Sequence, residues 1–519
     1  MSKHHFQIAI VGSGFAGSLL AVMAKRLGYS VVLIERGRHP RFAIGESSTP
    51  LANLLLEELA TRYDLPRLLP FAKWGSWQRT YPKIGCGLKR GFTFFHHEFG
   101  VPWTTRADRA NELLVAASPN ETIADTHWFR PDFDEFFMHE ARALGADCFD
   151  ETNLTTAEFD QDGASLAGSW HGQAVRFRAR FVVDASGPRG FLHRALSLGE
   201  REFPGYPATQ ALYSHFTGVQ RWDELFLSAE IPPFAPDDAA LHQVFPGGWM
   251  WLLRFNNGLT SAGVSVNDKL ASELNLSEGE PAWHRLLTRL PSVARQFAEA
   301  KPVREFTHLP RLTFRSAQMV GDRWALLPSA AGFVDPLLST GFTLTLLGVE
   351  RLAALLARGP NPRRASLDCY AAETDADLFA AANMIAALHR QLARPAEFHA
   401  LLMLYFAAAS FSETARRLRR PELAPGFLLR GRPDFAAACE HIISAVNQGI
   451  LYGPALISAV QTATAPVDVG GWADERKRNW YPVEFAPLLA TADRLGVGRG
   501  EILAMLRRAG VEPAQLPAG

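Results

Sequence analysis

Cysteines are few in this chain of 519 residues, and long hydrophobic runs are missing. The four cysteines are far apart and form no Cys-x-x-Cys pair, which argues against a zinc site and a disulfide framework and fits a reducing compartment. No apolar run approaches the ~18 residues of a membrane span, and no apolar signal segment follows the N-terminus. We therefore expect a cytoplasmic protein without a bound metal ion.

An excess of charge of either sign is also missing. The chain has 53 basic and 53 acidic side chains, whereas a nucleic-acid-binding surface needs a basic stripe that neutralises phosphates. The basic segment 416–420 is a local exception, which we interpret as the solvated face of a helix. Neither nucleic acid nor a membrane is expected as a partner, and the length suggests roughly two to four domain-sized units.

A complete strand–helix–strand pattern occupies the N-terminus. Residues 6–11 form a short apolar strand pattern, residues 18–27 a helix pattern, and residues 31–35 a second apolar strand that ends in an acid. Between the first two lies the glycine turn 12–17. Gly-x-Gly-x-x-Gly in this position predicts a Rossmann-like dinucleotide-binding unit.

Each residue of the glycine motif has a physical task in such a unit. The first glycine makes the tight turn, the second lets backbone N–H groups approach a pyrophosphate, and the third lets the helix pack closely on the strand. The acid at the end of the second strand accepts hydrogen bonds from a ribose, but the motif does not distinguish FAD from NAD. The predicted cofactor-binding residues are Gly12, Ser13, Gly14, Phe15, Ala16, Gly17, Glu35 and Arg36.

The rest of the chain alternates between helical and strand patterns. Residues 47–60 and 130–145 are predicted helices, the second ending at a capping glycine. Short strands are expected over 154–186 and an antiparallel sheet with one good hairpin over 208–267. From residue 335 the pattern is mainly helical. The fold class is therefore α/β, α+β overall, with an antiparallel-sheet domain and a helical C-terminal region.

Three further segments resemble the FAD-contacting segments of flavin-dependent halogenases. They are Gly45–Pro50, Asp184–Gly187 and Ala331–Pro336, and the resemblance ends near residue 350. Arg130 and Asp134 are similar to a helix start near the cofactor in the wider aromatic-hydroxylase superfamily. By this resemblance FAD is the cofactor, and the additional cofactor-binding residues are Glu46, Ser47, Arg130, Asp184, Ser329 and Gly332.

Two halogenase features follow from the same resemblance. Ser339, Thr340 and Gly341 match the segment that holds the halide, since hydroxyl and N–H donors suit a weakly hydrated anion; alternatively, this segment only begins the next helix. Trp249 and Trp251 partly match a Trp-x-Trp-x-Ile-Pro signature that lies near the flavin. Two tryptophans packing on one face of a strand are the alternative.

Lys89 matches the catalytic lysine of the halogenases, just before an aromatic strand. In the family such a lysine conveys hypohalous acid, either by hydrogen bonding or as a chloramine. Burial would lower its pKa and favour the second form. Lys83 is the competing lysine, and an ordinary surface lysine is the remaining alternative.

Two positions depart from the family pattern. Leu338 stands where many halogenases have an acid, so a tryptophan substrate is not expected and a phenol or resorcinol-like ring is favoured. Ser329 stands where the superfamily has an aspartate that binds the ribityl chain, so the hydrogen bond loses its charge and FAD is expected to bind weakly.

The resemblance implies a domain division and a reaction. The FAD domain is predicted at 1–95, 130–200 and 305–360, the substrate domain at 96–129 and 201–304, and a helical region at 361–519 that covers the substrate cavity. A separate NAD(P)H-dependent reductase supplies FADH2. O2 then gives a flavin C4a-hydroperoxide, chloride or bromide gives hypohalous acid, and the lysine presents the halogen to the ring.

Several points stay open at this level. The alternatives in function are an FAD-dependent aromatic monooxygenase or reductase and a flavin-binding protein without halogenase activity. A homodimer is considered, and the base that activates the substrate is unassigned. The candidates for this base are His96, His97, Glu98 and Asp108, although solvated or packed roles are favoured for each.

Overall fold

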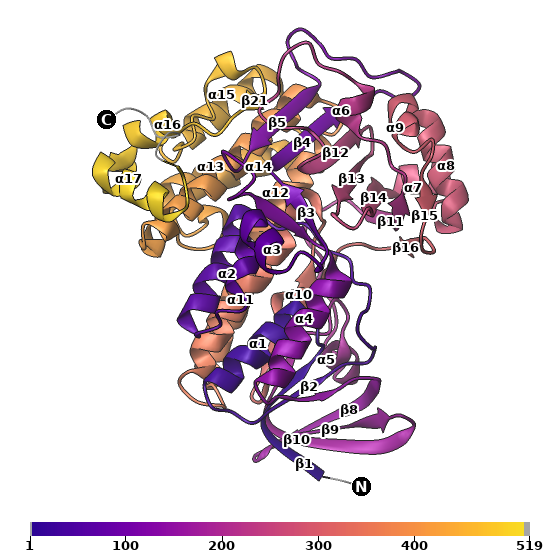
Figure 1. Ribbon diagram of the computed structural model, residues 1–519, viewed down its shortest axis with the longest axis vertical. Helices are drawn as coiled ribbons and strands as arrows, with labels where there is room; N and C mark the ends of the chain where they lie inside the picture. Colours follow the sequence, from indigo (N-terminus) through magenta and orange to yellow (C-terminus); the bar gives the residue numbers. More distant parts are fainter. Residues whose placement is uncertain (1–2, 513–519) are drawn as a thin grey trace.

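Two large sheets and a set of helices make up the fold, as the sequence predicts (Figure 1). The computed structural model describes residues 3–512. In Figure 1 the two sheets lie at opposite ends of the long axis, and the C-terminal helices flank the second sheet. The expected α/β class is confirmed.

The first sheet has eight strands and contains the predicted strand–helix–strand unit. Six strands follow the order β18-β19-β10-β1-β2-β7, and β1 pairs in parallel with both β2 and β10. The other two strands branch off this order, because β9 also pairs with β10 and β8 pairs with β9. Helix α1 packs against α4 and α11. The strands are β1 (Lys3–Val11), β2 (Val31–Ile34), β7 (Asp147–Phe149), β8 (Thr152–Asp160), β9 (Gly163–Trp170), β10 (Gln173–Asp184), β18 (Val320–Gly321) and β19 (Trp324–Leu326).

The second sheet has nine strands, in the order β15-β11-β14-β13-β12-β4-β5-β21, with β16 also on β11. It contains two successive hairpins, β12–β13 and β13–β14, where the sequence predicted one. Two small pairs, β3–β6 and β17–β20, stand apart. The strands are β3 (Cys86–Lys89), β4 (Gly91–His96), β5 (Glu112–Ala116), β6 (Asp125–Trp128), β11 (Thr209–Thr217), β12 (Ala240–Phe245), β13 (Gly248–Arg254), β14 (Thr260–Asn267), β15 (Lys301–Pro302), β16 (Thr307–Leu309), β17 (Phe314–Arg315), β20 (Gly332–Phe333) and β21 (Trp480–Tyr481).

The helices fall into two sets, before and after residue 335, and α12 to α17 lie within the predicted helical region 361–519. The first set is α1 (Phe15–Arg26), α2 (Pro50–Arg62), α3 (Trp74–Thr80), α4 (Arg130–Ala143), α5 (Phe191–Ala195), α6 (Trp222–Leu225), α7 (Asp268–Leu274), α8 (Glu280–Arg289), α9 (Pro291–Gln296) and α10 (Pro328–Ala331). The second set is α11 (Thr340–Leu356), α12 (Arg364–Arg390), α13 (Pro395–Arg417), α14 (Pro433–Asn447), α15 (Gly453–Thr464), α16 (Phe485–Ala490) and α17 (Arg499–Arg508).

The segment Leu337–Leu356, which includes α11, is long and apolar enough to cross a membrane by composition alone. However, 72% of that window is buried inside the protein. The packing of α11 against α1, α2 and α12 accounts for its apolar character. We therefore describe it as a core helix.

Some predicted boundaries and one predicted surface are wrong. Helix α2 begins at Pro50 rather than residue 47, because the Thr49 hydroxyl caps it by accepting from the Ala52 N–H. The basic segment 416–420 is not simply a solvated face. Arg416 forms ion pairs with Glu58 and Glu350 and is mostly buried.

The backbone approaches closely at two glycines of the turn, as the predicted packing of helix on strand requires. Gly12 has φ +101°, and a Cβ there would lie 2.6 Å from the Ala185 carbonyl carbon. A Cβ on Gly17 would lie 2.0 Å from the Gly12 carbonyl oxygen. Helix α1 therefore rests on the turn itself, and only glycine permits that approach.

Gly17→Ala should therefore lower the free energy of unfolding by ~1–3 kcal/mol, because the added methyl forces α1 away from the turn. Gly500→Ala is the matched control, since no atom lies within 4 Å of a Cβ at that helical position. Chemical denaturation measures both. Equal stability of the two variants would contradict the close contact.

Candidate functional site

A cavity of about 500 Å³ lies against the glycine turn and the N-terminus of α1. Its walls also come from the loop after β2, the turn after β10, the start of α10 and the start of α11. An elongated dinucleotide fits such a cavity. The predicted site residues that line it are Gly12, Gly14, Phe15, Ala16, Glu35, Arg36, Arg130, Ser329, Gly332, Thr340 and Gly341.

Glu35 is held at the edge of this cavity as an ionised acceptor. Its carboxylate accepts hydrogen bonds from the Ser13 N–H at 2.9 Å, from the Gly37 N–H at 2.9 Å and from Arg41 at 2.9 Å. Burial alone would raise the pKa of Glu35, but Arg41 and these hydrogen bonds lower it below its ordinary value. A charged acceptor in this position suits a ribose diol.

Arg130 and Asp134 form a buried bidentate ion pair beside the cavity. The Arg130 Nε and one terminal nitrogen each lie 2.8 Å from an Asp134 oxygen. Asp134 also accepts from the Phe15 N–H at 3.2 Å, and Arg130 donates to the Gly45 carbonyl at 2.9 Å. The pair thus ties the N-terminus of α1 to the loop after β2, which fixes two walls of the cofactor cavity.

Other predicted site residues lie behind the cavity wall. Glu46 accepts from His215 at 2.9 Å, and Asp184 accepts from the N–H groups of Ser186 and Leu192. Ser13 hydrogen bonds Glu35 through both its N–H and its hydroxyl. These side chains organise the cavity walls, and their predicted contact with a cofactor stays a prediction.

The loop before α11 has a conformation that needs support. Leu338 and Ser339 have φ values of 69° and 54°, in a region that non-glycine residues seldom adopt. The Tyr405 hydroxyl donates to the Leu338 carbonyl at 3.0 Å, and the Leu337 N–H donates to Asp335 at 2.9 Å. The loop delivers Thr340 and Gly341 to the cavity at the start of a 17-residue helix.

Lys89 is completely buried at the end of β3. Its Nζ lies 2.9 Å from Ser47 Oγ, 2.5 Å from the Ser48 carbonyl oxygen and 3.3 Å from Ser339 Oγ. It also lies 4.0 Å from the centre of the Phe92 ring. Ser47, predicted to bind cofactor, therefore contacts the lysine. Lys83, the competing lysine, is exposed on the turn before β3.

The amine of Lys89 has an acidic neighbour that sequence reasoning missed. Burial lowers the pKa of Lys89, and Asp125 opposes part of that effect. Asp125 is the cross-strand partner of Lys89 in the β3–β6 pair, and Asn53 donates to its carboxylate at 2.9 Å. Burial and the charge of Glu413 raise the pKa of Asp125. Lys89 and Asp125 are far apart in sequence, and the pairing of β3 with β6 brings them together.

A second cavity, of about 170 Å³, is lined by a neighbour of Lys89, although Lys89 itself lines neither cavity. Phe92, whose ring contacts the lysine, belongs to its wall, and so do Thr49 and Thr343, whose hydroxyls are 2.8 Å apart. One face of α13 and residues around Trp472 also line it. The C-terminal region therefore forms part of the wall of a cavity, its predicted covering of a substrate stays a prediction, and the start of α11 contributes to both cavities.

The tryptophan pair and the histidines lie outside both cavities. Trp249 and Trp251 are buried on one face of β13, with ring centres 5.7 Å apart. His96 and His97 are buried, and burial lowers the pKa of both. Of the acidic candidates for a base, Glu98 and Asp108, neither lines a cavity and both are exposed.

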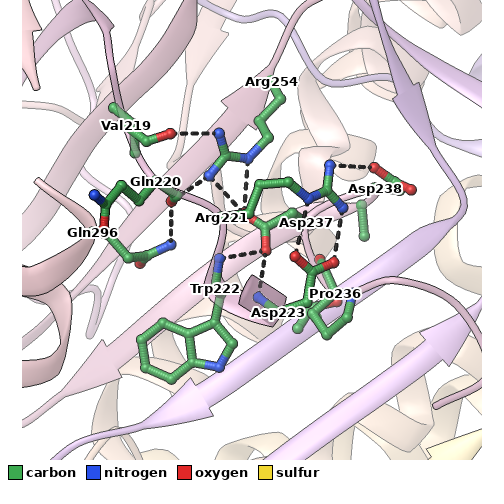
Figure 2. Close-up of polar contacts among 12 residues, drawn as sticks. Val219, Gln220, Arg221, Trp222, Asp223, Pro236, Asp237, Asp238, Arg254 and Gln296 are labelled. Atoms are coloured by element: carbon green, nitrogen blue, oxygen red, sulfur yellow. Dashed lines mark hydrogen bonds and ion pairs between the residues drawn. The ribbon is translucent and has the colours of Figure 1, made fainter. Parts of the chain in front are cut away.

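Arg254, which replaces the proline of the tryptophan motif, anchors a separate polar network (Figure 2). Its guanidinium lies 2.7 Å from the fully buried carboxylate of Asp237 and donates to the Val219 and Gln220 carbonyls. Asp237 in turn accepts from the Trp222 N–H at 2.7 Å. The replacement therefore fixes the segment before α6 to the end of β13.

Comparisons with known proteins agree on the family. Residues 7–306 match the family described as FAD dependent oxidoreductase. Monodechloroaminopyrrolnitrin halogenase of Pseudomonas fluorescens is 31% identical over 69% of this chain and 62% of its own length. Tetracycline 7-halogenase of Kitasatospora aureofaciens is 32% identical over 66% of this chain and 61% of its own length. The match thus spans less than two thirds of either relative.

Solved structures agree on the fold. The halogenase PltM in complex with phloroglucinol and FAD superposes with a TM-score of 0.80, at 23% identity, over 91% of this chain and 99% of that one. The flavin-dependent halogenase CmlS superposes with a TM-score of 0.58 over 98% of this chain, at 18% identity. The halogenase-like arrangement of sheets and C-terminal helices is therefore shared.

Ser329→Asp should tighten FAD binding by about tenfold, because a carboxylate accepts a stronger hydrogen bond than a hydroxyl. Ser329 is half-buried in the cavity wall, so the new charge keeps contact with solvent. Quenching of flavin fluorescence measures the dissociation constant. Ser329→Ala is the control and should bind more weakly than wild type. Weaker binding by the aspartate variant would contradict the expected ribityl contact.

Arg254→Ala should lower the free energy of unfolding by ~3–5 kcal/mol, because it leaves the buried Asp237 carboxylate without the cation that pairs with it. Arg221→Ala is the contrast in the same network (Figure 2), since Arg221 pairs with the partly exposed Asp223 and Asp238 and should cost only ~0–1 kcal/mol. Chemical denaturation compares the two. Similar losses of unfolding free energy in the two variants would contradict the larger contribution expected of the buried Arg254–Asp237 ion pair.

Proposed function

We propose, from the premise that this chain belongs to the FAD-dependent oxidoreductase family, that it is a halogenase. It would use reduced FAD, O2 and chloride or bromide to halogenate a small electron-rich aromatic ring, above all a phenol. The halogenase relatives and the halogenase-like fold support this activity. The single observation that carries it is the position of Lys89.

Lys89 lines neither cavity, but its contacts reach residues beside both of them. It contacts Ser339, which precedes Thr340 of the first cavity, and Phe92 of the second cavity. An amine in this place can pass an electrophilic halogen from one cavity to the other without releasing it to water. The lowered pKa supports a neutral amine as the carrier.

The first cavity suits FAD and a halide. When bound in its reduced form, the flavin supplies the activation of O2 and the oxidation of the halide. Gly12, Gly14 and the N-terminus of α1 would hold the pyrophosphate, and Glu35 the ribose. The start of α11, with the Thr340 hydroxyl and free helix N–H groups, would hold the halide, because these donors and the helix dipole favour an anion.

The second cavity suits a single aromatic ring. A cavity of ~150 Å³ lined by apolar side chains binds benzene, and this one has about 170 Å³ with walls that include Phe92, Tyr405 and Phe406. A monocyclic phenol such as phloroglucinol, found in one structural neighbour, is the expected kind of substrate.

The proposal extends to partners and location. A separate NAD(P)H-dependent flavin reductase would supply reduced FAD, as the resemblance to the flavin-dependent halogenases implies. We further propose a cytoplasmic enzyme, where the reductase and NAD(P)H are at hand. A homodimer is part of the proposal and is testable by light scattering.

The test of the activity is a reconstituted assay. Purified protein, a flavin reductase, NADH, FAD and a panel of monocyclic phenols are incubated with chloride or bromide, and products are followed by mass. We expect a halide-dependent mass gain that Lys89→Ala abolishes, a loss of at least ~1,000-fold because the lysine is the only route for the halogen. Lys83→Ala is the matched control and should keep full activity.

Other outcomes favour the other functions. Insertion of oxygen without halide would indicate an aromatic monooxygenase, and reduction of the flavin by NADPH without the reductase would indicate a single-component hydroxylase or reductase. FAD binding without either reaction would indicate a flavin-binding protein. Full activity of Lys89→Ala would overturn the proposed role of the lysine.

A further inference from the structure

The second cavity contains two carboxylates in an otherwise largely apolar wall. Glu484 lies at its outer part, since 46% of its side chain is exposed and it pairs with Lys477 at 3.1 Å. Glu413 is more enclosed, with 23% of its side chain exposed. Of the two, Glu413 is placed to meet a substrate inside.

Glu413 belongs to the face of α13 that forms the cavity wall. Phe406, Ala409, Ser410 and Glu413 recur at helical spacing and all line it. Apart from Glu413, this face presents aromatic, methyl and hydroxyl groups, which suit a neutral ring. Among the residues of α13 that line the cavity, Glu413 carries the group that can act as a base towards that ring.

The geometry of Glu413 leaves it ready to accept a proton. Arg417 Nε donates to Oε1 at 2.7 Å, which fixes the carboxylate one turn along the helix and leaves Oε2 for another partner. Glu413 also acts electrostatically on Asp125, the cross-strand partner of Lys89. The carboxylate and the lysine therefore belong to one charged cluster, which also includes Arg417 and Lys73.

We propose that Glu413 is the catalytic base that accepts the hydroxyl proton of a phenol bound in the second cavity. This inference rests on the proposed halogenase function. It also accounts for Leu338, an apolar residue at the position where many halogenases have an acid: here the carboxylate comes from α13 instead.

The step balances in atoms and electrons. The hydroxyl proton moves to Glu413, and the freed electron pair on oxygen enters the ring. The Lys89 amine first takes the halogen from hypohalous acid, forming a nitrogen–halogen bond and releasing water. A ring carbon ortho or para to the oxygen then forms the new carbon–halogen bond as the nitrogen–halogen bond breaks, and the amine nitrogen takes the proton from that carbon. Glu413 returns its proton to the oxygen. The products are the halophenol, water and the restored amine.

The test uses the acidity of the substrate. Glu413→Gln keeps the shape and the contact with Arg417 but cannot take a proton. With phenol itself, whose pKa of ~10 keeps it protonated, kcat should fall by ~100-fold or more. With 4-nitrophenol in mildly alkaline buffer, where the substrate is already ionised, the variant should keep activity within about threefold of wild type, since the base is no longer needed.

Two comparisons complete the design. Glu440→Gln, an exposed glutamate on α14, is the matched control and should equal wild type on both substrates. Bound FAD and thermal stability of each variant are measured alongside. Equal losses on both phenols, no loss on either, or the acidity-dependent loss in Glu484→Gln instead would overturn the assignment. Absence of halogenation by the wild-type protein with every phenol would instead overturn the proposed function.

Discussion

The burial of one amine constrains much of this structure. Lys89 is held by hydrogen bonds to Ser47 and Ser48, before α2, and to Ser339, before α11. A buried lysine is costly unless polar partners surround it. The end of β3 and the starts of two helices must therefore meet at a single point, and residues next to that point line both cavities. Thr49, the cap of α2, and Thr343 extend the same junction.

The charges around this amine compensate one another through several elements. Asp125 lies across the β3–β6 pair, Asn53 of α2 holds its carboxylate, and Glu413 and Arg417 of α13 act on it from the second cavity. Burial lowers the pKa of the lysine and raises that of the aspartate. Both groups are thus driven towards their neutral forms, so a proton can leave the amine without stranding a charge in the interior.

Features that depend on neighbouring residues along the chain could be predicted from sequence. Features that depend on packing between distant segments could not. The task of Gly17 follows from spacing along the chain, because a glycine motif between a strand and a helix has one packing solution. The place of Asp125 depends on strand pairing, and that of Glu413 on how α13 packs across the sheet, so neither carries a signal in its own segment. Glu46 is a different case: its motif predicts contact with the cofactor, which stays a prediction, and its carboxylate lies 2.9 Å from His215.

Residues that depart from the halogenase pattern have polar partners in the structure. Arg254 replaces a proline, and its guanidinium neutralises a buried carboxylate and holds two carbonyls. Leu338 replaces an acid, and its carbonyl accepts from Tyr405 of α13, the helix that carries Glu413. Residues under no selection seldom acquire matched buried partners, since an unmatched polar group costs ~1–3 kcal/mol. Arg254 thus belongs to a network apart from both cavities, whereas α13 both supports the loop before α11 and borders the second cavity.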